Sequence, residues 1–228
     1  MKKLCLLFSV LLLVTFFVGC NKTTSPEDAK LMVTTEEMSD DQRAIAEVIM
    51  AYDKAYYEWD SEAQRVCATP EFPIEDTEMM LRNAFGVYVD QGDMVEEDIE
   101  KYLEIEKASY QKGAEQLKYS GWKIVVSDEE ATALVTYEYP NIDANMPSYG
   151  EQLKLYRDEL FVSVCDMDEA TAKASLSAEE FSATYLQVIE LDYAKRSENA
   201  PYVENTMEFR LKKVDGKWLI SELVLPEA

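Results

Sequence analysis

The stretch 207-MEFRLKKVDGKWLI-220, close to the C-terminus, carries the clearest secondary-structure pattern of the chain. Apolar and charged side chains alternate over Met207–Lys212, which is the period of a strand that buries one face. Asp215-Gly216 follows, a dipeptide preferred in two-residue hairpin turns, and Trp218–Ile220 forms the returning strand. The stretch therefore predicts an antiparallel hairpin with one face packed on a core.

A second hairpin is predicted upstream, with strands at Trp122–Val126 and Ala131–Tyr139. Alternate residues of the later strand share one face: Ala131, Ala133, Val135, Tyr137 and Tyr139. The acidic segment Ser127–Glu130 between the strands is interpreted as a turn in preference to a cation site.

Helical spacing of apolar residues fills most of the remaining chain. It predicts one long helix from Ser39 to before Pro70, then helices at Glu75–Asp90 and Val95–Lys118, and two more between Tyr149 and Pro201. Capping boxes mark two of the helix starts, Ser39 with Gln42 and Ser177 with Glu180. Leu160–Cys165 fits a helix and a strand equally well.

These elements together predict an α+β fold. N-terminal helices pack on an antiparallel sheet, and a helical insertion precedes the C-terminal hairpin. Residues 39–228 are expected to form a single domain.

The N-terminus has the pattern of an export signal. Lys2 and Lys3 precede an uncharged, mostly apolar run over Leu4–Val18, which is too short to cross about 30 Å of hydrocarbon as a helix. The run ends at Gly19-Cys20, and a polar tract follows over residues 21–38. Residues 1–20 are therefore interpreted as a signal peptide and residues 21–38 as a flexible tether.

The segment Phe17–Cys20 resembles the lipobox of bacterial lipoproteins. That resemblance implies that Cys20 becomes the lipidated first residue of the mature chain, held at the extracytoplasmic face of the cell membrane. Two or more acyl chains suffice for stable anchoring. An uncleaved N-terminal anchor and an ordinary signal cleaved nearby are the alternatives.

Charge and composition exclude several classes of function. Residues 1–20 contain two lysines and no acidic residue. Without them the chain has 20 basic and 45 acidic side chains, a net charge of −25. Such a surface lacks the basic footprint that nucleic acids need. The absence of histidine excludes Ser-His-Asp and Cys-His nucleophiles and imidazole metal sites. No cofactor, metal or catalytic motif is present, so none is predicted.

Two cysteines remain beyond Cys20. Cys67 and Cys165 form an even pair in an oxidising compartment, which makes a disulfide possible. Two separately buried thiols are the alternative.

Acidic motifs are interpreted as structural. Glu96–Asp98 opens a predicted helix, where negative charge favours the positive end of the helix dipole. Cys165–Ala170 lacks the ligand and the glycine that an EF-hand requires, which indicates a solvated turn.

The order of elements resembles the nuclear-transport-factor-2-like cone. The segments that carry the resemblance are Trp122–Tyr137 and Asp215–Ile220, and they look similar to domains in lipoproteins of Gram-positive gut bacteria. The resemblance implies a curved antiparallel sheet wrapped around a long helix.

We expect a non-catalytic module of the cell envelope that binds a small molecule, a peptide or another envelope protein. The alternative is a small-molecule isomerase or hydrolase that uses a buried carboxylate and a tyrosine, as some enzymes of the cone fold do. Tyr137, Tyr139 and Asp192 are candidates for those roles. Capture of divalent cations by the acidic surface is a third hypothesis.

Overall fold

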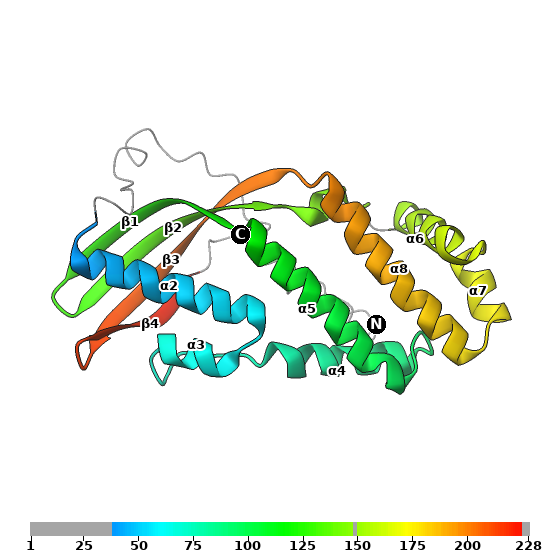
Figure 1. Cartoon of the computed structure of the whole chain (residues 1–228), viewed down its shortest axis with the longest axis horizontal. Helices are drawn as coiled ribbons and strands as arrows, with labels where there is room; N and C mark the ends of the chain where they lie inside the picture. Colours follow the sequence, from blue (N-terminus) through cyan, green and yellow to red (C-terminus); the bar gives the residue numbers. More distant parts are fainter. Residues whose placement is uncertain (1–37, 148–149, 225–228) are drawn as a thin grey trace. The chain divides into compact units, whose positions relative to one another are not determined.

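The computed structural model describes residues 38–147 and 150–224 (Figure 1). The predicted signal peptide, Cys20 and the predicted tether up to residue 37 lie outside these residues. Met38, expected as the last residue of the tether, is 5% exposed and belongs to a hydrophobic core. Met38 therefore belongs to the core of unit 1, one residue before the predicted start of the domain.

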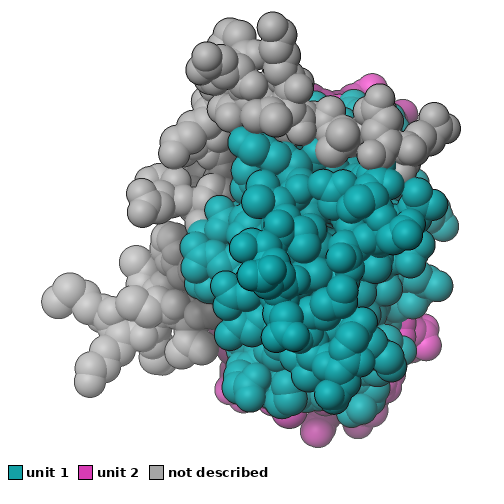
Figure 2. Space-filling view, turned by 90° about the vertical axis from the view of Figure 1, so that its left-hand side faces the viewer, with its two compact units in different colours: residues 1–76, 111–139, 203–228 teal, residues 77–110, 140–202 magenta. Residues whose placement is uncertain are grey.

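The described residues divide into two compact units, which Figure 2 colours teal and magenta. Unit 1 takes residues 38–76, 111–139 and 203–224, and unit 2 takes residues 77–110 and 140–202. The prediction of a single domain is not tested by this division and stays a prediction.

Both predicted hairpins are confirmed as parts of one four-stranded antiparallel sheet. Its strands are β1 (Lys118–Ser127), β2 (Glu130–Pro140), β3 (Tyr202–Val214) and β4 (Lys217–Val224), in the order β1-β2-β3-β4. Asp215 and Gly216 form the two-residue turn between β3 and β4, with φ of 50° and 77°. Positive φ at both positions is the type I′ geometry that an Asp-Gly pair favours.

The central strands β2 and β3 are joined by the helical insertion and still pair antiparallel. Lys213 N donates to Glu129 O at 2.8 Å at one end, and Asn141 N donates to Pro201 O at 2.8 Å at the other. The insertion therefore leaves and re-enters the sheet at neighbouring positions.

The prediction of one long helix before Pro70 is wrong in one respect, because the structure has two helices there. α2 (Asp40–Glu58) ends at Trp59, whose φ is 59°, and α3 (Ser61–Cys67) begins after Asp60. The Asp60 carboxylate accepts a hydrogen bond from Ala63 N at 2.8 Å and so caps the new helix. The apolar residues keep their helical spacing from α2 into α3, so the periodicity of the sequence does not reveal the break.

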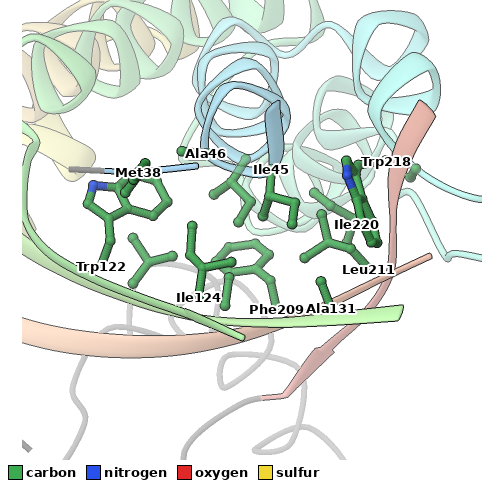
Figure 3. Packing of buried hydrophobic residues seen from close by; sticks show 14 of the residues in the cluster. Met38, Ile45, Ala46, Trp122, Ile124, Ala131, Phe209, Leu211, Trp218 and Ile220 are labelled. Carbon is green, nitrogen blue, oxygen red and sulfur yellow. The ribbon is translucent and has the colours of Figure 1, made fainter. Parts of the chain in front are cut away.

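The core of unit 1 lies between α2 and one face of the sheet (Figure 3). Ile45 and Ala46 of α2 point down onto Ile124, Phe209 and Ile220 of the strands in that view. Beyond α3, Thr69 N donates to Ile220 O at 2.8 Å, which covers part of the edge of β4.

Unit 2 is mostly helical. Its elements are α4 (Thr77–Asp90), the 3-10 helix η3 (Glu96–Asp98), the first part of α5 (Ile99–Gln116), the 3-10 helix η4 (Ile142–Asn145), α6 (Glu151–Cys165), α7 (Glu169–Ser175) and α8 (Ala178–Glu198). The ambiguous segment Leu160–Cys165 is helical. Phe161 and Phe181 stack with ring centroids 5.7 Å apart in its core.

The predicted α+β class is thus confirmed, with helices packed on the sheet and a helical insertion before the last hairpin. Both predicted capping boxes are present, at Ser39 with Gln42 and at Ser177 with Glu180. No helix among the described residues is both long and apolar enough to span a bilayer.

Candidate functional site

A carboxylate held by two tyrosines lies in unit 1, between α2 and the sheet. Tyr137 donates its hydroxyl to Asp53 Oδ2 at 2.9 Å, and Tyr119 donates to the same oxygen at 3.0 Å. No described residue donates to Asp53 Oδ1. We refer to Asp53, Tyr119 and Tyr137 as the Asp53 centre.

Local structure explains how these three side chains meet. Asp53 lies four residues after Ile49 and eight after Ile45, both fully buried, so it continues the core-facing stripe of α2. A bulge at Ser120 lets both Tyr119 and Trp122 of β1 pair with residues on one face of β2, opposite Tyr137 and Val135. The bulge thus brings Tyr119 to the same face as Tyr137.

Burial changes the acidity of Asp53. Desolvation raises the pKa of its carboxyl, the hydrogen bonds from Tyr137 and Tyr119 offset part of that rise because they favour the charged form, and the resulting pKa is about 7. The residue as a whole is half-buried, and its carboxyl group is the desolvated part of it. Near neutral pH the group exists in both protonation states.

Aromatic rings surround the Asp53 centre. Tyr119 stacks on Trp122 with centroids 5.3 Å apart and planes at 17°, and it lies 5.3 Å from the ring of Tyr137. Burial, and then the charge of Asp53, raise the pKa of Tyr57 on the same helix. The tyrosine hydroxyls here are neutral donors at physiological pH.

A second carboxylate with two tyrosines lies in unit 2. Glu106 is 5% exposed, and its Oε1 accepts hydrogen bonds from Tyr102 and, at 2.6 Å, from Tyr193. Burial raises the pKa of Glu106, while those two bonds and the charge of Arg196 act to lower it. Unlike Asp53, Glu106 therefore has a positive charge acting on it.

The residues proposed for an acid–tyrosine pair do not form one. Tyr137 is bound to Asp53, whereas Asp192 accepts hydrogen bonds from Tyr156 at 2.7 Å and from Arg196 at 2.8 Å in unit 2. Tyr139 is half-buried on the same strand as Tyr137. Asp53, and not Asp192, is the carboxylate that Tyr137 contacts.

The acidic motifs lie at helix and strand ends. Asp166 ends α6 with φ of 60°, and Asp168 caps α7 by accepting from Thr171 N at 2.8 Å. Ser127 pairs with Glu130, so Asp128 and Glu129 form the predicted turn. The described residues contain no group of three or more Asp, Glu or Cys side chains placed to share a metal ion.

The two cysteines belong to different units. Cys67 is buried in unit 1, Cys165 is half-buried in unit 2, and both are free thiols in the structure. The Cys67–Cys165 bridge stays a prediction.

Sequence reasoning missed Asp53, although a signal for it exists. An acid at the fourth position after Ile49 falls on an apolar helix stripe, where an unpaired charge is costly. Glu106 shows the same signal, four residues after Tyr102 on α5.

Asp53 is expected to make stability depend on pH. The folded protein holds a proton on Asp53 up to about pH 7, whereas an unfolded chain releases it near pH 4, at about the ordinary aspartate pKa. Its contribution is therefore full below about pH 4 and is lost as pH rises through about 7. Asp53→Asn keeps an acceptor for both tyrosines and carries no charge. We expect this variant to gain stability over the native chain between about pH 5 and about pH 8 in urea unfolding.

A stability difference between the two proteins that stays constant over this range would contradict the assignment. The comparison with Asp53→Asn is needed because other acids change the stability of the protein with pH in the opposite direction. Hydrogen bonds lower the pKa of Asp41 and of Asp98.

No protein-family model matches the chain, and a search of curated proteins finds no match either. The function of the Asp53 centre must therefore be inferred from the chemistry of its own residues.

Proposed function

We propose that this chain is a lipid-anchored extracytoplasmic protein of the cell envelope, and that unit 1 binds a small molecule at the Asp53 centre without catalysis. The lipid on Cys20 is the proposed link to the membrane, and an envelope protein is the alternative partner. Nucleic acid is not among the proposed partners.

One observation carries the binding proposal. The Asp53 carboxylate is desolvated on the core face of a sheet, with Oδ2 held by two hydroxyls and Oδ1 engaged by no described residue. A few convergent polar groups among apolar and aromatic side chains are typical of small-molecule sites. Desolvation of an acid costs free energy, and a ligand that engages Oδ1 recovers part of that cost.

Proton transfer at Asp53 is the second candidate function. A carboxyl group with a pKa of about 7 suits a general base at neutral pH. In this geometry, however, Tyr119 and Tyr137 both donate to Asp53, so neither hydroxyl is available to stabilise negative charge on a substrate oxygen. This arrangement favours binding over catalysis.

A thermal-shift screen tests the binding proposal. A panel of small charged and neutral molecules is applied to the native chain, to Asp53→Asn and to Glu106→Gln, in which the buried carboxylate of unit 2 is changed in the same way. We expect at least one compound to raise the melting temperature of the native chain and of Glu106→Gln but not that of Asp53→Asn. If no compound distinguishes the Asp53 variant, the Asp53 centre is not a small-molecule site.

Lipid attachment has its own test. We expect Cys20→Ala to leave the membrane fraction in cell fractionation, because a chain without acyl groups loses its stable anchor. Intact-mass analysis of the native protein should show an N-terminus at Cys20 that carries acyl chains. A native N-terminus without acyl chains would exclude the anchor.

A further inference from the structure

Among the described carboxyl groups whose pKa is raised by burial, Asp53 differs in having no lysine or arginine that acts on it. Burial raises the pKa of four described carboxyl groups: Asp53, Glu106, Asp143 and Glu169. An arginine acts on three of them, Arg196 on Glu106 and Asp143, and Arg157 on Glu169. No described lysine or arginine acts on Asp53.

The hydrogen bonds of the Asp53 centre show which groups of a ligand it can accept. Both tyrosine hydroxyls donate to Oδ2, so neither of these two residues has a hydroxyl donor left for a ligand anion. What it offers is the acceptor Oδ1, with a negative charge when Asp53 is ionised. The complementary ligand group is a cation or a strong hydrogen-bond donor.

The surrounding rings favour an organic cation in particular. The faces of Trp and Tyr rings attract ammonium groups, and the attraction increases when the cation is desolvated. Trp122 and Tyr137 are each 3% exposed in the core, whereas Tyr119, whose ring contacts both of them, is half-buried and is the ring of the Asp53 centre that a ligand can reach. The chain's large negative charge also raises the local concentration of cations.

We propose that the Asp53 centre binds a cationic organic ligand, an amine or a quaternary ammonium compound, through Asp53 Oδ1 and the ring of Tyr119. This inference rests on the proposed binding function and names its ligand class. The ammonium group supplies a positive charge at Asp53, where no described lysine or arginine acts. Tyr119 and Tyr137 keep the carboxylate in place through their hydrogen bonds.

Binding of such a ligand depends on the ionisation of Asp53. The titratable groups that interact with it are Tyr52 and Tyr57 on α2, Cys67 on α3, Tyr119 on β1 and Tyr137 on β2. Burial raises the pKa of each of them, so they stay neutral near pH 7. For a permanently charged ligand, affinity therefore rises with pH as Asp53 ionises.

Calorimetric titration with choline tests the ligand class, because choline keeps its charge at every pH. The control ligand is its uncharged carbon analogue, in which a tert-butyl group replaces the trimethylammonium group. The full chain is used in a nonionic detergent at about 0.15 M salt, which screens weak attraction to the acidic surface. Asp53→Asn is the test variant, and Glu106→Gln is the matched control.

We expect saturable choline binding at least about tenfold tighter than binding of the analogue. Asp53→Asn should lose that preference, and Glu106→Gln should keep it. From about pH 6 to about pH 8 the affinity should rise about tenfold, which is the increase in the ionised fraction of a group with a pKa of about 7.

Two results would overturn the inference in distinguishable ways. Equal binding of choline and its analogue, or no choline binding while a neutral compound from the screen depends on Asp53, excludes the cation and leaves the binding site intact. If neither probe binds and no screened compound depends on Asp53, the ligand class and the proposed site are both wrong.

Discussion

Replacing Arg196 with alanine is expected to destabilise unit 2 by about 3 kcal/mol, because it removes a buried guanidinium group and leaves two half-buried carboxylates without their positive partner. Arg196 is 7% exposed and forms ion pairs with Asp143 at 3.0 Å and with Asp192 at 2.8 Å. Its guanidinium group also lies 4.9 Å from the ring centroid of Tyr193. Without it, Asp143 and Asp192 repel each other in a partly desolvated site.

Arg210 provides a matched control for this prediction. It too contacts two carboxylates at 3.0 and 2.8 Å, those of Glu208 and Glu222, but its side chain is 50% exposed on the sheet. Pairs that remain in water contribute at most about 1 kcal/mol, so Arg210→Ala should have a small effect. Urea unfolding followed by far-UV circular dichroism measures both variants. Equal losses of stability in the two variants would show that the buried pairs of Arg196 stabilise the protein no more than the exposed pairs of Arg210.

Replacing Phe209 with alanine is expected to destabilise unit 1 by about 4 kcal/mol. Phe209 is 1% exposed and lies in the core between the sheet and α2 (Figure 3). The substitution removes the ring and leaves a cavity that the sheet cannot close, because neighbouring strands hold the backbone of β3 on both sides. A loss of this size is a large fraction of the stability of a typical domain.

Tryptophan fluorescence reports this effect within unit 1. The three tryptophans of the chain, Trp59, Trp122 and Trp218, all belong to that unit. Val125→Ala serves as the control, since Val125 lies in the same sheet and is 60% exposed. We expect the control to lose less than about 1 kcal/mol. If Phe209→Ala is no more destabilised than Val125→Ala, the assignment of the core face is wrong.

The elements that the sequence predicts well are those determined by local patterns. Alternation and an Asp-Gly pair indicate the β3–β4 hairpin, and Ser177 with Glu180 marks the start of α8. The break at Trp59 was missed because the apolar spacing of α2 continues into α3. α7 was missed because Asp168 was interpreted as part of a solvated turn, whereas it caps a short helix.

The candidate site is less predictable because it depends on contacts between distant segments. Asp53 and Tyr137 are 84 positions apart in the chain, and Tyr119 reaches them only through the bulge at Ser120. The strand pattern correctly identifies Tyr137 as a core-facing tyrosine, but the sequence suggests Asp192 as its acid, whereas the structure pairs it with Asp53. An acid on an apolar helix stripe marks such a site, but it does not identify which tyrosines will contact it.

The cationic-ligand proposal connects stability with function. An ionised Asp53 destabilises the folded state near neutral pH, because its charge is desolvated and no described cation compensates it. Proteins retain such costly groups where a ligand uses them. Binding of an ammonium group is therefore expected to stabilise the protein most above about pH 7, where Asp53 is ionised.

The most direct test of this account is the pKa of Asp53 itself. Carboxyl-carbon NMR of the native chain, with Asp53→Asn to assign the signal, follows the titration of this one group. We expect a midpoint at about 7, and a downward shift when choline is added. A midpoint near the ordinary aspartate value of about 4 would mean that Asp53 is fully solvated, and it would contradict both the binding site and its ligand class.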